Sequence, residues 1–346
     1  MSAVPPPGLV LPDAWFVACT SDELRTAPKA VTIQGRPLVL FRNTNGQPTA
    51  LADRCPHRNV PLSMGRVVRG ELECAYHGWK FDHAGACTSV PGLMTQDPSL
   101  KSRCAEAHAT RELDGFIWVY SSPAREPKDE PFRFPHLDTR GYTTVRRRFV
   151  VEAGLHAALE NTLDVPHTAY LHGGLFRTEE KKNVIDVVVQ RHARHAEARF
   201  IGEPAPRGLA GLVLAPRGGV VEHVDRFLLP CIAQVEYRLG ERAHLLATTA
   251  FTPASDDETH VFAVVTLRLP VPGWLVRPFI APIATRIFAQ DRVMLRRQRE
   301  QVKRFGGEKY TSTELDVLGP QITLLLKHAA NGEDATAHEH RLQMRT

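Results

Sequence analysis

Two short segments of this sequence each combine one cysteine with one histidine. The first is Cys55-Pro56-His57 and the second is Cys74-Ala75-Tyr76-His77, with sixteen residues between His57 and Cys74. A cysteine thiolate and a neutral imidazole are both good ligands for transition metals. We therefore expect the two segments to form one metal site with two sulfur and two nitrogen ligands.

The order of the ligands in these segments favours iron over zinc. Structural zinc sites usually group Cys with Cys and His with His, whereas each segment here mixes the two. Two thiolates on one iron and two imidazoles on the other form the ligand set of a Rieske [2Fe–2S] cluster, which transfers single electrons. Gly78 and Trp79 follow the second pair, and residues 89–92 are expected to form a third loop over the cluster. A structural zinc site is the alternative.

A second set of candidate ligands lies near the middle of the chain. Asn161, Asp164 and His167 lie three residues apart, so they share one face of a predicted helix. His172 lies about 140° away from His167 on an ideal helix. The two imidazoles therefore converge only if the helix bends or ends between them, and Pro166, which lacks an N–H, favours such a distortion.

Two imidazoles and one carboxylate form the facial triad of non-haem iron oxygenases, which leaves coordination positions open. Asp291 is the best candidate for the carboxylate, because it interrupts an apolar stripe of a predicted helix. A carboxylate on a buried face is costly unless it is paired or binds a metal, so a salt bridge to an arginine is the alternative. The stripe comprises Ile280, Ile283, Ala284, Ile287, Met294 and Leu295. Weaker candidates, in turn-like or charged surroundings, are Asp225, Asp256, Asp257 and Glu300.

The pattern of strands, helices and turns predicts two domains in the α+β class. Residues 1–122 are expected to form a small antiparallel β domain with its core at about residues 15–120, residues 123–135 a linker, and residues 136–346 a catalytic domain. Strands are predicted in the first domain at residues 30–34, 38–42, 49–53 and 116–120. Strands are predicted in the second domain at residues 143–152, 184–190, 195–201, 233–239, 244–252 and 261–269. Helices are predicted at residues 154–172, 275–305 and 318–330.

Composition excludes several classes of protein. The net charge of +5 over 346 residues is too small to indicate nucleic-acid binding. No run of eighteen apolar residues predicts a membrane span, and the Pro-rich N-terminus does not resemble a secretory signal. Cys19, Cys87, Cys104 and Cys231 lack the spacing of a disulfide framework. We expect reduced thiols and a cytoplasmic protein. Two basic runs, at residues 146–148 and 296–304, are solvated faces or a docking surface for an acidic redox partner.

Over nearly its whole length the sequence resembles the oxygenase component of the Rieske non-haem iron oxygenase family. The resemblance implies that the C-terminal domain has a helix-grip fold of the START/Bet v 1-like kind. It implies that Asp164 is the aspartate that bridges the two metal sites and that Asn161 lies beside the iron. The implied cluster ligands are Cys55, His57, Cys74 and His77, and the implied ligands of one mononuclear Fe(II) are His167, His172 and Asp291.

The resemblance also implies an activity and an assembly. The chain is expected to be a terminal oxygenase that inserts oxygen from O2 into a small hydrophobic or aromatic substrate. Its compact length and the lack of a recognisable insertion favour an α-only enzyme. By analogy with the family, such an enzyme is expected to carry out monooxygenation, hydroxylation or oxidative demethylation, and aromatic cis-dihydroxylation is the alternative chemistry. Members similar to this chain are head-to-tail homotrimers, in which the cluster of one subunit lies next to the iron of its neighbour.

Two other readings of the sequence remain open. One is an electron-transfer protein with an inactive iron site, and the other is a non-catalytic binding protein. The sequence contains no G-x-G-x-x-G segment, so a separate NAD(P)H-dependent reductase or a ferredoxin is expected to supply the electrons. Apolar segments at residues 209–214, 227–232, 261–269 and 274–288 line the expected substrate cavity or belong to an ordinary core.

Overall fold

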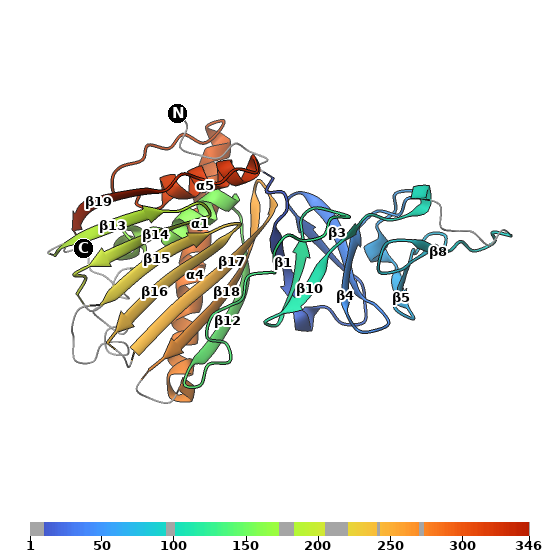
Figure 1. The fold of residues 1–346 in the computed structure, drawn as a ribbon, viewed down its shortest axis with the longest axis horizontal. Coiled ribbons are helices and arrows are strands. Elements are labelled where there is room, and N and C mark those ends of the chain that lie inside the picture. The colour runs from blue at the N-terminus through green and yellow to red at the C-terminus, as the bar shows by residue number, and fades with distance from the viewer. Residues whose placement is uncertain are drawn as a thin grey trace. The chain divides into compact units, whose positions relative to one another are not determined.

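The chain divides into two compact units, which are described separately. The computed structural model describes residues 10–94, 101–172, 183–204, 221–240, 243–269 and 273–345 (Figure 1). The N-terminal unit comprises Leu11–Arg133 together with Thr252–Ser255. The C-terminal unit comprises Phe134–Phe251 and Asp256–Thr346, to which Met1–Val10 are also assigned.

The N-terminal unit consists of three small antiparallel sheets, as the short predicted strands indicated. The first sheet has the order β1-β11-β10 and comprises β1 (Trp15–Thr20), β11 (Phe116–Tyr120) and β10 (Thr110–Leu113). The second has the order β2-β3-β4-β9 and comprises β2 (Lys29–Ile33), β3 (Arg36–Arg42), β4 (Pro48–Ala52) and β9 (Ala107–His108). The third has the order β5-β6-β7-β8 and comprises β5 (Arg66–Val68), β6 (Glu71–Glu73), β7 (Lys80–Phe81) and β8 (Cys87–Ser89).

A buried cluster beneath these sheets supports the two Cys/His segments. Phe41 and Leu51 of the second sheet meet Leu72 and Phe81 of the third. Cys55 and Cys74 belong to the same cluster and are 2% and 3% exposed. The apolar core therefore fixes the position of the two cysteines from below.

The C-terminal unit is built on one antiparallel sheet of eight strands (Figure 1). The strand order is β12-β18-β17-β16-β15-β14-β13-β19, so the last strand of the chain closes one edge next to β13. The strands are β12 (Thr143–Val151), β13 (Val184–Arg191), β14 (His195–Ile201), β15 (Glu222–Leu228), β16 (Ile232–Leu239), β17 (Ala243–Ser255), β18 (Glu258–Arg268) and β19 (His338–Arg345).

Helices cover one face of this sheet. They are α1 (Leu155–Leu163), α4 (Gly273–Arg304) and α5 (Gly319–Ala330), and the short helix α2 (His167–Leu171) follows α1. The long helix α4 packs against β12, where the rings of Phe149 and Phe288 lie 4.6 Å apart. One long helix held by an antiparallel sheet is the helix-grip arrangement, so the predicted α+β fold class is confirmed (Figure 1).

The predicted helix at residues 154–172 is interrupted in the structure. Helix α1 ends at Leu163, and α2 begins at His167 and ends at Leu171. Asp164 has an extended backbone (φ −85°, ψ 107°) and Pro166 precedes the first residue of α2. The distortion that the two histidines require is therefore present. Gly173 and Gly174, expected to end the helix, lie outside the described residues.

Several expectations about the C-terminal unit were wrong or incomplete. Strands β15 and β19 were not predicted, because charged residues and histidines hide their alternation. Asp225 lies inside β15 and is buried, whereas the sequence analysis assigned it to turn-like or charged surroundings. Met294, assigned to the apolar stripe of α4, is 50% exposed, while Leu295 is 4% exposed. The expected cavity segment at residues 209–214 lies outside the described residues.

Candidate metal centres

The two Cys/His segments form turns with the same backbone hydrogen bonds. The amide of Cys55 donates to the carbonyl of Val60 at 2.9 Å, and the amide of Cys74 donates to the carbonyl of Trp79 at 2.8 Å. Both bonds connect a cysteine to the fifth residue after it. The two loops therefore present their Cys and His side chains in similar ways, although their sequences share little else.

Each turn also has one residue in the left-handed region, four positions after the cysteine. These residues are Asn59, with φ of 61°, and Gly78, with φ of 69°. Asparagine and glycine are the residues that adopt this conformation most readily. A Cβ atom at Gly78 would also lie 3.1 Å from Cγ of Pro91, so the loop at residues 89–92 packs closely against the second turn.

The Cys and His side chains of these loops lie at different depths. Cys55 and Cys74 are buried, whereas His57 is half-buried and His77 is exposed. The two imidazole rings lie 4.6 Å apart, and the ring of His57 stacks on Trp79 at 4.7 Å and 3°. This arrangement fits a two-iron cluster whose sulfur-bound iron is inside and whose imidazole-bound iron faces the surface.

The side chains of His57 and Cys55 give further evidence on what these loops bind. Nδ1 of His57 is buried and has no hydrogen bond among the described residues. Burial, together with the neighbouring Cys74 thiol, raises the pKa of Cys55 to about 11. A buried thiol of this kind carries charge at neutral pH only when a cation is bound. These observations support the cluster assignment of the four side chains, which remains a prediction.

The structure brings His167, His172 and Asp291 together, as the sequence predicted for the second site. His167 is the first residue of α2, His172 caps the same helix, and Asp291 lies in α4. One candidate ligand atom from each residue lies within 4.8 Å of the others. Nε2 of His172 is 3.1 Å and Nε2 of His167 is 3.7 Å from Oδ1 of Asp291.

Hydrogen bonds on the far side of each imidazole fix its orientation. Nδ1 of His167 lies 2.5 Å from the backbone carbonyl of Asp164, and Nδ1 of His172 lies 3.0 Å from Oε1 of Gln290. Both acceptors assign the proton to Nδ1, which leaves Nε2 of each ring to bind a metal. Such outer partners orient metal ligands and tune their basicity. Gln290 was missed by the sequence reasoning, and its position next to Asp291 was the only available signal.

The charges at this site are suited to a cation. Oδ1 of Asp291 is buried and accepts no hydrogen bond among the described residues. Burial raises the pKa of Asp291, but His167 and His172 outweigh burial, so the pKa lies below its ordinary value. Burial lowers the pKa of His167, yet Asp164 and Asp291 raise it to about 9. A bound metal ion would replace that proton and give the carboxylate oxygen a partner.

The two remaining predicted site residues lie on α1 or at its end. Asp164 caps α1, and its Oδ2 lies 3.4 Å from Nδ1 of His167. Asn161 lies one turn earlier and is half-buried, and its side chain forms no hydrogen bond within the described part of the chain. The structure therefore places Asp164 directly beside the triad and shows no such contact for Asn161.

The rival carboxylates are engaged elsewhere. Asp225 lies 2.9 Å from Nε2 of His223, and Asp257 forms ion pairs with Arg299 and with Lys303, the latter at 2.6 Å. Glu300 pairs with a neighbouring arginine of α4 at 2.8 Å. None of these carboxylates belongs to the His167, His172 and Asp291 group.

Comparisons with known families agree with the two units. Residues 14–102 match the Rieske [2Fe-2S] domain, and residues 151–329 match the vanillate O-demethylase oxygenase C-terminal domain. Within the described residues, no helix is long and apolar enough to cross a membrane.

Two relatives are distant in sequence but cover most of the chain. Protein TIC 55, chloroplastic, from Arabidopsis thaliana is 26% identical over 297 residues, which are 83% of this chain and 53% of that protein. This chain therefore spans about half the length of TIC 55. The vanillate O-demethylase oxygenase subunit of Pseudomonas sp. strain HR199 is 25% identical over 350 residues, which are 94% of this chain and 96% of that protein.

A solved structure shares the fold. The crystal structure of dicamba monooxygenase bound to dicamba aligns with a TM-score of 0.77 at 22% identity, covering 93% of this chain and 98% of that one. At this identity the likeness shows the fold alone, and the domain matches show the family. The chain carries a Rieske [2Fe–2S] domain and belongs to the Rieske non-haem iron oxygenases whose catalytic domain is of the vanillate O-demethylase type.

Proposed function

We propose that this chain is the terminal oxygenase of a multicomponent Rieske system and uses O2 to oxidise a small hydrophobic or aromatic substrate. The observation that carries the proposal is the presence of two separate ligand sets in one chain. One set has two thiols and two imidazoles. The other has two imidazoles around a buried carboxylate oxygen that accepts no hydrogen bond from the residues that the structure describes. An electron carrier needs only the first set, and a binding protein needs neither.

In this proposal Cys55, Cys74, His57 and His77 hold the [2Fe–2S] cluster. The buried cysteines anchor it to the core, and the more exposed histidines face outward, where an electron enters or leaves. Electrons come from a separate NAD(P)H-dependent reductase or a ferredoxin, because the sequence shows no dinucleotide-binding segment.

His167, His172 and Asp291 are proposed to hold one mononuclear Fe(II). When iron is bound there, it supplies sites for O2 activation that a facial triad leaves open. The protein's own contribution is orientation, since Asp164 and Gln290 hold both Nδ1 protons and aim both Nε2 atoms at the carboxylate. The ring of Phe288 in α4 lies 4.6 Å from that of Phe149 in β12, and this contact holds the helix that carries Asp291 against the sheet.

The favoured reaction is monooxygenation, including oxidative demethylation of a methoxy group. One oxygen atom enters a C–H bond and the other leaves as water, with two electrons from the redox partner and two protons. A hydroxylated methoxy carbon then breaks down to a hydroxyl group and formaldehyde. The names of the vanillate and dicamba relatives support this chemistry, and cis-dihydroxylation remains the alternative. A cytoplasmic location also stays a prediction.

Metal content and product together test the proposal. We expect three irons per chain. When a methoxylated aromatic acid is supplied with reductant and O2, we expect one formaldehyde to form for each molecule of the acid that is consumed. A diol product would move the assignment to dihydroxylation. Two irons per chain with no oxidised product from such a panel would favour the electron carrier, and zinc in place of iron would exclude both.

We also propose that the protein is a homotrimer. In it, Asp164 connects the cluster of one subunit with the mononuclear iron of its neighbour. Asp164→Asn keeps the backbone carbonyl that binds His167 but removes the carboxylate charge 3.4 Å from that ring. We expect all three irons to remain and the oxidation of the reduced cluster in a single turnover to slow by at least about tenfold. Wild-type rates of cluster oxidation in a trimeric variant would rule out the bridging role.

A further inference from the structure

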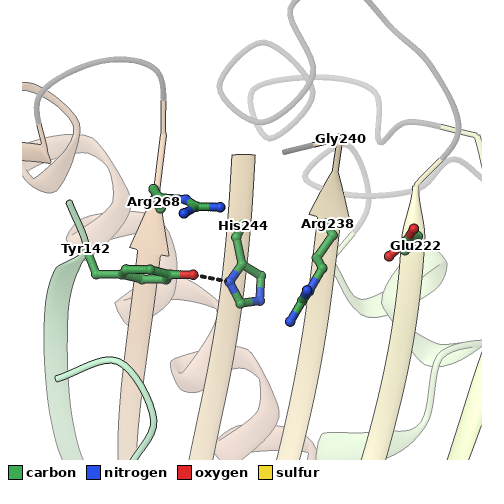
Figure 2. Close-up of a pocket in the computed structure, with 6 residues that line it drawn as sticks. All are labelled: Tyr142, Glu222, Arg238, Gly240, His244 and Arg268. Carbon is green, nitrogen blue, oxygen red and sulfur yellow. Dashed lines mark hydrogen bonds between the residues drawn. The ribbon is translucent and has the colours of Figure 1, made fainter. Parts of the chain in front are cut away.

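A pocket of about 590 Å³, lined mostly by residues with polar side chains, opens on the C-terminal unit and contains none of the proposed metal ligands. It is lined by Tyr142, Glu222, Arg238, Gly240, His244 and Arg268 (Figure 2). Volumes of this order are typical of pockets that bind small molecules. The chemistry of the lining indicates what kind of molecule it suits, independently of the proposed oxygenase function.

Neighbouring strands of the sheet contribute these residues as a row. Glu222 of β15 is directly opposite Arg238 of β16, and Arg238 is directly opposite His244 of β17. Tyr142 precedes β12, and Arg268 is the last residue of β18. Figure 2 shows the side chains in front of the strands, with helices behind them. The pocket therefore lies on the face of the sheet that the helices leave uncovered.

A buried carboxylate beneath the pocket organises its polar groups. Glu236 accepts hydrogen bonds from Nη1 of Arg226 at 2.6 Å, Nε of Arg238 at 2.6 Å and Nε2 of His244 at 2.9 Å. Burial raises the pKa of Glu236, but the two arginines outweigh burial and lower it to about 2. Glu236 is therefore ionised at neutral pH, and its negative charge is compensated by the arginines that donate to it.

The contact with Glu236 also fixes the tautomer of His244. Because Nε2 donates to Glu236, Nδ1 accepts, and the hydroxyl of Tyr142 donates to it at 2.6 Å. The ring of Tyr142 stacks on His136 at 4.2 Å and 4°, and the guanidinium of Arg268 lies 5.5 Å from its centroid. The phenol is therefore a rigid, partly apolar wall of the pocket.

Arg238 provides the donors for a ligand. Its Nε is bound to Glu236, but within the described residues no acceptor reaches its two Nη atoms, and its side chain is 52% exposed. A guanidinium held at Nε and open at Nη presents a fork that matches a carboxylate. Arg268 adds a second positive charge to the lining, against the single carboxylate of Glu222.

We propose that this pocket binds a small organic carboxylate, whose carboxylate group takes the Nη atoms of Arg238 and whose organic part lies against Tyr142. Glu222 limits the affinity, because its negative charge faces the same space. Because Arg238 and Glu222 carry opposite charges, substitutions at the two positions should change the affinity for the carboxylate in opposite directions. Arg238→Gln must weaken binding, and Glu222→Gln must strengthen it.

Isothermal titration of the intact iron-loaded protein with benzoate tests the proposal. We expect a benzoate site whose Kd rises about tenfold or more in Arg238→Gln, since hydrogen bonds between charged groups are the strong ones. The Kd falls in Glu222→Gln and is unchanged in Arg341→Gln, which removes an exposed arginine of β19. Arg238→Lys retains the charge without the fork and has an intermediate Kd, which covers the case in which Arg238→Gln does not fold.

Three outcomes would overturn the proposal. The first is benzoate binding that is insensitive to both Arg238 variants, which would place the benzoate elsewhere. The second is an equal loss in Arg341→Gln, which would show a general charge effect. The third is phosphate binding as tightly as benzoate, which would leave no role for the organic part of the ligand.

Discussion

The two proposed metal sites are built in opposite ways. All four proposed ligands of the cluster come from two turns within 23 residues of sequence, from Cys55 to His77, and each turn repeats the same backbone hydrogen bond. The second site joins the two ends of α2 to a helix far away in sequence. His172 and Gln290, which are in contact at this site, are 118 residues apart.

The two sites therefore depend on different parts of the fold. The cluster loops need a local core beneath Cys55 and Cys74 and two residues that tolerate positive φ. The triad needs α2 and α4 to be held at one separation and one rotation by the eight-stranded sheet. A change in the packing of α4 should therefore disturb the triad and leave the cluster intact, and the converse should also hold.

The largest expected effect comes from Asp291→Ala. The variant removes the carboxylate between the two imidazoles, and loss of a direct ligand should cost more than the 10–100-fold typical of outer partners. We expect the iron content to fall from three to two per chain, turnover to fall by at least about 100-fold, and the visible spectrum of the cluster to persist. Iron analysis and product formation measure this.

Glu300→Ala is the matched control, because it removes an exposed carboxylate from the same helix. It should keep all three irons. Product formation at the wild-type rate by Asp291→Ala would end the assignment of this residue as a ligand.

The reciprocal change is Cys74→Ser. Serine is a poor substitute for a thiolate, so we expect the visible absorption of the cluster to vanish while one iron per chain remains at the triad. Electron supply would stop, and turnover with the redox partner would be lost. Retention of the full visible spectrum, or loss of all iron, would contradict the independence of the two sites.

A buried histidine of the sheet should control stability at alkaline pH. His223 lies between Glu203 at 2.6 Å and Asp225 at 2.9 Å, and it stacks between Phe200 and Tyr237. Burial opposes its charge, but the two carboxylates raise the pKa to about 9 from the ordinary value of 6.5.

Because the pKa of His223 is higher in the folded protein than in the unfolded chain, protonation of His223 stabilises the folded state. The stabilisation is therefore fully present below pH 6.5 and is lost as pH rises through about 9. The loss is on the order of 3 kcal/mol. Denaturant unfolding at pH 6 and pH 9.5 should show it in the wild type, and His223→Gln should lower stability at pH 6 and flatten the pH dependence. Parallel pH profiles would contradict the proposed charge state.

The smallest expected effect concerns Glu160 of α1. Burial, with Asp316, Asp164 and Glu308 nearby, raises its pKa to about 7 from 4.5. Because the folded state disfavours the ionised form, Glu160 subtracts stability as pH rises from 4.5 through 7. Glu160→Gln should therefore raise Tm at pH 8 more than at pH 5, by an amount reduced by solvent screening. Glu339→Gln, at an exposed position of β19, is the control and should leave this difference unchanged.

The sequence predicted the cluster loops and the triad for different reasons. The spacing of Cys and His is a local signal and needs no knowledge of the fold. Asp291 was found only because a charged residue interrupted an apolar stripe, and that stripe was partly misjudged, since Met294 is exposed. Gln290 could not be found, because its role depends on how α4 is rotated against α2.

The same limit explains the strands that were missed. In β15 the residues of one face include the buried His223 and Asp225, while Glu222 and Arg226 lie on the other. Polar residues on both faces remove the alternation that identifies a strand. The buried ionic contacts of His223 and Asp225 form only when β14, β15 and β16 pair in register. The role of these residues therefore could not be predicted before the sheet was known.

Because Gln290 and Asp291 are adjacent in α4, their contacts with His172 depend together on how α4 is rotated about its axis. Both side chains contact His172, and neighbouring residues of a helix project about 100° apart. A deletion of one residue from the preceding turns of α4 would swing both contacts away together, even if every side chain kept its chemical identity. We therefore expect exposed residues of α4 to be exchangeable with little effect on the two contacts, whereas a change in the length of α4 before Gln290 would disturb both.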